Sequence, residues 1–117
     1  MTTESLAAAV LSDIVETGTE DYKTSIESTD INDVVDPYWA SLFNLYNRLS
    51  VGDRSTLIAI IRQSQIDALA TMFAAIDGIT SLRGQNEDMH LVSQGGNKLS
   101  GGLSDEFLRL VEEGSKS

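Results

Sequence analysis

The chain has no cysteine, and only one proline and one histidine occur among its 117 residues. Without cysteine it has no disulfide framework, no thiolate metal ligand, no redox motif and no cysteine nucleophile. A single histidine also leaves a histidine-based zinc site without its second ligand. No apolar run is long enough to cross a bilayer, and Glu4 stands where a signal peptide would carry positive charge. These absences predict a cytoplasmic protein with no metal and no cofactor.

Basic side chains are scarce at the start of the chain. Residues 1–36 hold nine acidic side chains and one base, Lys23, for a net charge of −8, whereas the remaining residues carry only −2 of the total of −10. Such a field repels nucleic acid phosphates and anionic membranes and attracts cations. We therefore expect a basic protein as partner, and neither nucleic acid nor membrane. The simpler alternative is that the acidity only keeps the protein soluble.

Length and hydrophobic periodicity predict one globular domain over residues 1–117, mainly α with a minor β part. The fold class we expect is a small helical bundle built on a central antiparallel helical hairpin. The predicted elements are an N-terminal helix at about 4–17, an acidic connector at 19–35, the two hairpin helices at about 36–49 and 51–77, a short β-hairpin at about 89–100 and a C-terminal helix at about 104–113.

Local signals set these boundaries. Leu6, Val10 and Ile14 repeat at helical spacing, and Gly18 is the expected stop of that helix. Asp36 before Pro37 is a strong helix start. Because only a few residues separate the next two helices, an antiparallel hairpin is expected.

Two further helix starts and one helix stop are expected after residue 49. Ser50 is placed to cap the long helix, and Asp77 with Gly78 to end it. Ser104 is placed to cap the last helix. The Gly-Gly-Asn sequence at 95–97 suggests the turn of the β-hairpin.

Four polar residues could form a site. Arg62 and Gln65 project from the apolar side of the long helix, Asp77 ends it, and His90 is the single histidine. If they converged between the long helix and the β-hairpin, they would line a pocket for a small molecule or a reaction. The alternative is structural: an amide fixing a helix crossing, an arginine stem lying over the core, a helix stop and a histidine on a hairpin strand.

No catalytic motif is present, and we therefore expect a non-enzymatic protein-binding module, such as a small acidic inhibitor, immunity or adaptor protein. Carboxylates would steer the partner and apolar side chains would anchor it. A homodimer through Ala70 and Ala74 is a further possibility. The expected partner-binding residues are Glu20, Asp21, Tyr22, Ile26, Glu27, Asp30 and Asp33.

Overall fold

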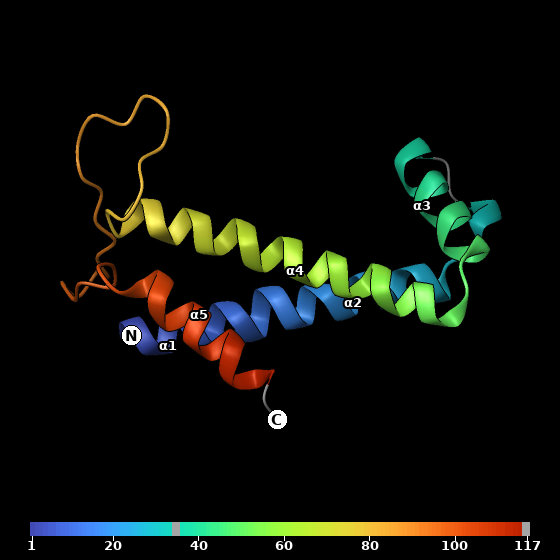
Figure 1. Cartoon of the computed structure of the whole chain (residues 1–117), viewed down its shortest axis with the longest axis horizontal. Helices are drawn as coiled ribbons and strands as arrows, with labels where there is room; N and C mark the ends of the chain where they lie inside the picture. The colour runs from blue at the N-terminus through green and yellow to red at the C-terminus, as the bar shows by residue number, and fades with distance from the viewer. Residues whose placement is uncertain (34–35, 116–117) are drawn as a thin grey trace.

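The computed structural model describes residues 1–33 and 36–115, and helices make up most of the fold (Figure 1). A long N-terminal helix, formed by three consecutive segments, lies beside the longest helix, and the C-terminal helix packs against both. The prediction of a mainly helical protein is confirmed. The elements are α1 (Thr3–Ala9), the π-helix η1 (Val10–Glu16), α2 (Thr17–Ser28), the 3₁₀ turn η2 (Ile31–Asp33), α3 (Pro37–Arg48), α4 (Val51–Ile76) and α5 (Leu103–Gly114).

The N-terminal helix is much longer than predicted. It continues through Gly18 and ends only at Ser28. The predicted stop at Gly18 is therefore wrong, and so is the irregular connector at 19–35, of which residues 34–35 lie outside the described part. Gly18 has a different role: a Cβ atom there would lie 3.0 Å from the Oε1 atom of Gln65. The glycine lets α4 come close to the N-terminal helix.

The π-helix η1 changes which residues of this helix are buried. In a regular α-helix Ile14 would lie over Val10, four positions earlier. In the structure Val10 and Val15 are buried, five positions apart, and Ile14 is 49% exposed. The hydroxyl of Thr17 donates to the carbonyl of Ser12 at 3.0 Å within this wide turn. The π-helix therefore rotates the buried side by one residue, and the rest of the helix continues in the new phase.

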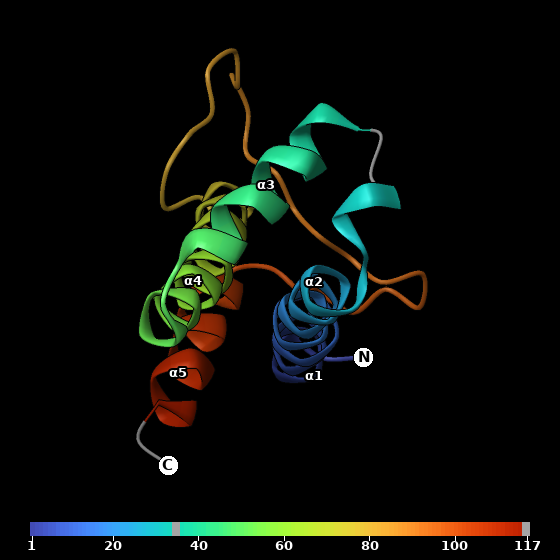
Figure 2. The same cartoon turned by 90° about the vertical axis from the view of Figure 1, so that its right-hand side faces the viewer.

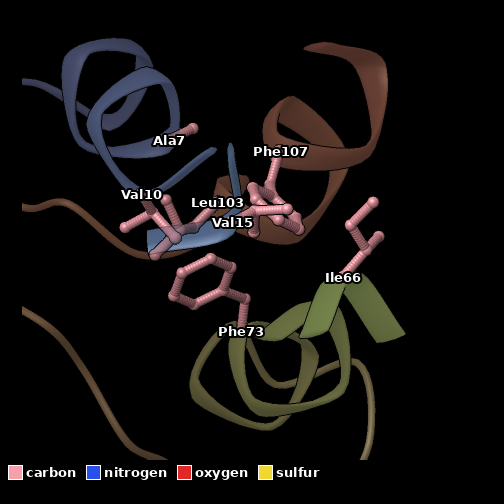
Figure 3. Close-up of a cluster of buried hydrophobic side chains, with 7 residues drawn as sticks. All are labelled: Ala7, Val10, Val15, Ile66, Phe73, Leu103 and Phe107. Carbon is pink, nitrogen blue, oxygen red and sulfur yellow. The ribbon is translucent and has the colours of Figure 1, made fainter. Parts of the chain in front are cut away.

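The core lies where the N-terminal helix, α4 and α5 meet (Figure 3). The rings of Phe73 and Phe107 pack edge to face with centroids 5.5 Å apart. Fully burying a large apolar side chain contributes roughly 1.5–3 kcal/mol. This junction therefore stabilises the contact among three helices that are distant in sequence. Its largest fully buried side chains are Phe107, Ile66, Leu103 and Val15.

The helices predicted at 36–49 and 51–77 are present as α3 and α4, with the expected caps. The Asp36 carboxylate accepts the N–H of Tyr38 at 2.8 Å, and Pro37 is the first helical residue. The Ser50 hydroxyl accepts the N–H of Asp53 at 3.1 Å. Both cap positions are therefore confirmed.

The predicted antiparallel packing of α3 along α4 is wrong. Figures 1 and 2 show α3 rising steeply from the first turn of α4, whereas α4 runs antiparallel to the N-terminal helix. α3 packs through a second cluster, in which Phe43 and Tyr46 meet Ile26 and the first turns of α4. Arg54 holds the corner, because it donates to the carbonyls of Tyr46 at 2.8 Å and Asn47 at 3.3 Å. The apolar side of α4 beyond this corner is already covered by the N-terminal helix and α5.

Asp77 ends α4 and also caps the start of α5. Its two carboxylate oxygens accept the N–H groups of Gly101 at 2.6 Å and Ser104 at 2.7 Å. Gly78 follows with φ of 83°, which confirms the predicted stop. Ser104 is not the cap that the sequence predicts: α5 begins one residue earlier, and the Ser104 hydroxyl donates to the carbonyl of Ala70.

The predicted β-hairpin at 89–100 is wrong. Between residues 77 and 102 the chain forms no β-strand. Its pairing there is limited to one isolated antiparallel bridge between Val92 and Lys98. The chain does reverse near the expected turn, where Gly96 has φ of 91°. However, the N–H of Leu91 donates to the Ser100 hydroxyl at 2.9 Å instead of a backbone carbonyl, which interrupts the ladder. Two such short arms cannot form a stable two-stranded sheet.

Deleting Asp13 should be tolerated, with a change in unfolding free energy within about 1 kcal/mol. Asp13 is an exposed residue of η1, and its loss converts the five-residue spacing between Val10 and Val15 to the α-helical four. Deleting Glu20, an exposed residue of α2, should cost more than about 2 kcal/mol, because it turns Ile26 about 100° away from its cluster. Urea denaturation measures both. Equal losses would contradict the role assigned to η1.

Substituting Asp77→Ala should lower the unfolding free energy by about 1–2 kcal/mol, as expected for loss of a helix cap. The matched control is Asp67→Ala on the same helix, where the carboxylate is exposed and, among the described residues, accepts one bond, from the Gln63 side chain. That change should stay within about 0.5 kcal/mol. Thermal denaturation followed by circular dichroism compares the two variants, and equal destabilisation would rule out the capping role.

Candidate functional site

The carboxylates expected to meet a partner lie on α2 and directly after it (Figure 1). Glu20, Asp21, Asp30 and Asp33 are all exposed. Within residues 1–33 and 36–115, no lysine or arginine forms an ion pair with any of these four. Asp30 accepts one local bond, from the backbone of Asn32 at 2.9 Å. Their charge is therefore available to a partner.

The two apolar anchors expected among these carboxylates are placed differently. Ile26 is buried, with 4% of its surface exposed, so its assignment as a partner-binding residue is wrong. The period of α2 turns it toward Phe43 of α3. Tyr22 is half-buried and packs on Trp39 with ring centroids 5.4 Å apart. It therefore offers a partner only part of its ring.

Tyr38 is a surface residue at the start of α3. It is 61% exposed and meets the ring of Trp39 at 5.5 Å, edge to face. A hydrogen bond with the Tyr38 hydroxyl, together with burial, raises the pKa of Tyr22. Tyr38 lies in the first turn of α3, next to Pro37, and this position is the one signal in the sequence that its side chain is exposed. The rings of Tyr22 and Tyr38 thus form an aromatic edge, joined through Trp39, next to the carboxylates of α2.

Glu27 does not belong with the unpaired carboxylates, because it accepts the hydroxyl of Tyr46 at 3.0 Å. It lines a groove of about 460 Å³ between α2, the end of α3 and the start of α4. Lys23 and Arg54 also line this groove. The Arg54 guanidinium lies 4.8 Å from the centre of the Tyr46 ring. The groove thus combines two cations, one carboxylate and one phenol.

The chemistry of this groove is that of a structural joint. Burial, the hydrogen bond to Glu27 and the charge of Glu27 raise the pKa of the Tyr46 hydroxyl, and the nearby Arg54 lowers it only in part. A phenol with a raised pKa stays protonated and is a poor general base. Arg54 is occupied by the carbonyls at the end of α3. These contacts tie α2, α3 and α4 together.

The four residues of the alternative pocket do not converge. Arg62 and Gln65 both reach the N-terminal helix, through Glu16 at 2.6 Å and Thr19 at 2.8 Å. Asp77 lies 15 residues further along the chain from Arg62, or roughly 22 Å at the helical rise. The contacts of Gln65 agree with the alternative that this amide fixes a helix crossing. Gln65 bridges two helices at the point where Gly18 allows them to approach.

Asp77 and His90 do share a cavity, of about 230 Å³, beside Asp88 and Lys98. His90 is exposed, and both oxygens of Asp77 are already bonded to backbone N–H groups. In the part of the chain that the structure describes, no group of histidine and carboxylate side chains could hold a metal ion. The cavity thus brings two of the predicted residues together without a free carboxylate from Asp77.

The helical side expected to form a homodimer is covered within the chain. Ala70 packs against the core, its carbonyl accepts the hydroxyl of Ser104, and Ala74 is half-buried. The bond from Ser104 places the start of α5 on this side of α4. A dimer contact through Ala70 and Ala74 would require α5 to leave.

Tyr46→Phe should destabilise the protein by about 1 kcal/mol at about pH 8, because the bond to Glu27 is lost. The folded-state pKa of Tyr46 lies above the unfolded value of 10.0, so its contribution is present below pH 10 and is lost as the pH rises through the folded pKa. The stability difference between wild type and variant should therefore shrink at about pH 11. Urea denaturation at both pH values measures it; a difference that grows with pH would contradict this.

No family model, no curated protein and no solved structure matches the chain. Among the described helices, none combines the length and the apolar composition needed to cross a membrane. Function therefore has to be inferred from the chemistry of the chain's own surface.

Proposed function

We propose that the protein is a non-enzymatic protein-binding module, a small acidic inhibitor, immunity or adaptor protein that engages a basic surface of its partner. The observation that carries this proposal is the set of four exposed carboxylates, Glu20, Asp21, Asp30 and Asp33, without ion pairs among the described residues. Lys23 is the only base in the first 36 residues. Four negative charges on one helix and the turn after it attract a cationic partner.

Charge and packing would contribute separately to binding. The carboxylates attract a basic surface over roughly one Debye length, about 8 Å at physiological ionic strength, and so raise the association rate. The aromatic edge formed by Tyr22 and Tyr38 offers apolar contact next to them. Tyrosine is among the residues that most often dominate binding energy at interfaces. A partner with lysine or arginine around an apolar centre fits this arrangement.

A small-molecule or enzymatic function has less support. It rests on the cavity shared by Asp77 and His90, whose 230 Å³ is below the usual range of roughly 300–1,000 Å³ for ligand pockets. Asp77 is occupied as a helix cap, which leaves Asp88, His90 and Lys98 as the titratable groups that could act there.

Replacing the adjacent pair Glu20 and Asp21 by lysine should abolish capture of basic proteins on the immobilised chain at low salt. Wild type should release those proteins as the salt concentration rises, because the attraction is screened. Mass spectrometry identifies the captured proteins, and their sequences give their net charge. The readout is the amount bound by each variant.

The chain contains its own matched control, the adjacent pair Glu87 and Asp88 in the loop after α4. Glu87→Lys with Asp88→Lys changes the net charge by the same amount at a different place. This variant should retain most of the capture. Equal loss in both double variants, or no salt-sensitive basic protein bound by wild type, would refute the proposed function.

A further inference from the structure

An apolar groove opens between the N-terminal helix and α5, and it is separate from the two cavities described above. Its volume is about 490 Å³, and its lining includes Leu11 and Ala8 on one wall and Leu110 on the other. Leu11 and Leu110 are half-buried and pack at the edge of the main core, while Ala8 is exposed. The lining comes from residues 8–16 of the N-terminal helix and from the last turn of α5, and Figure 2 shows these two helices as neighbours.

Carboxylates stand on both walls of this groove. Glu16 lines one wall and Glu113 the other, and the described lining contains no lysine or arginine. Each is bonded through one oxygen only, Glu16 Oε1 to Arg62 and Glu113 Oε2 to Arg109. The second oxygen of each accepts no hydrogen bond from the described residues. The apolar floor is therefore bordered by acceptors that suit cationic side chains.

The acidic border continues beyond the groove. Asp13 and Glu20 lie on the turns before and after Glu16 and are exposed. Arg109 does not cancel the opposite border, because Glu106 and Glu113 share it. The groove thus connects directly with the acidic surface of α2.

The walls of the groove restrict the conformation of an occupant. Both walls are helices, so their backbone N–H and C=O groups are bonded within each helix, and neither offers a free strand edge. A segment that enters must satisfy its own backbone, which a helix does. The longer wall, from Ala8 to Glu16, is roughly 12 Å long, enough for about two turns of a partner helix.

We infer that this groove binds a basic amphipathic helix, whose apolar side chains contact Leu11 and Leu110 and whose lysines or arginines meet Glu16 and Glu113. The inference rests on the proposed function and adds to it the place and the conformation of the bound segment. Apolar residues of the partner would recur at i, i+3, i+4 and i+7.

The test uses a synthetic leucine–lysine peptide of about 18 residues, long enough to form a helix, and a scrambled peptide of the same composition that is not amphipathic. Fluorescence anisotropy measures binding of both peptides to the full chain. Wild type should bind the amphipathic peptide about tenfold more tightly than the scrambled one. Equal affinity would overturn the inference, since charge alone would then explain the binding.

Leu110→Ser should weaken the affinity for the amphipathic peptide about tenfold and leave the affinity for the scrambled peptide unchanged. Leu108→Ser is the matched control, because Leu108 is 43% exposed on the same helix and does not line the groove. If Leu110→Ser impairs folding, Ala8→Trp fills the groove from an exposed position and should have the same effect. Unchanged binding by a folded Leu110→Ser or Ala8→Trp variant would overturn the inference.

Charge at the border is tested by Glu113→Gln against Glu87→Gln in the loop. The first should weaken the amphipathic peptide several-fold, and the second should not. If capture of basic proteins still depends on Glu20 and Asp21 while the groove variants change nothing, only this inference fails. If no basic protein or peptide binds the wild-type chain, the proposed function fails as well.

Discussion

The fold depends on the burial of Val15 at the junction with Ile66 and Phe107. All three side chains are less than 2% exposed, and they come from the N-terminal helix, α4 and α5. A regular α-helix through residues 10–16 would have placed Ile14 over Val10 instead. The π-helix brings Val15 to the junction, and the later part of the helix keeps that phase. Contacts between α4 and the N-terminal helix, including Gln65 with Thr19, therefore depend on one wide turn.

This phase also decides which charges are exposed. Once Thr19 and Ile26 face inward, Glu20 and Asp21 must lie outside, since they occupy other sides of the same helix. Glu16 forms an ion pair with Arg62, and Glu27 accepts a hydrogen bond from Tyr46. These two carboxylates therefore make contacts between helices of the fold. The acidic sequence is thereby divided between structural contacts and open surface.

Sequence reasoning succeeded where a signal acts within a few residues. Asp36 before Pro37 and the serine at position 50 start their helices as predicted, because a cap needs only the next two or three N–H groups. It failed at Gly18 and at the β-hairpin. A glycine inside a helix and a glycine at its end look alike in sequence, and only the approach of Gln65 distinguishes them. The turn expected at Gly96 is present, but the N–H of Leu91 donates to the Ser100 hydroxyl and not to a backbone carbonyl of the facing segment.

By itself, the sequence determined the existence of the helices, the starts of α3 and α4, the charge of the first third and the absence of thiol chemistry, because these are local or additive properties. Tertiary structure alone decided which helices pair, since the short link before α4 permits a corner as readily as a hairpin. It also decided that Asp77 caps α5 and does not join Arg62 in a pocket. Such contacts join residues far apart in the chain, and their geometry follows from the packing of whole helices rather than from any one stretch of residues.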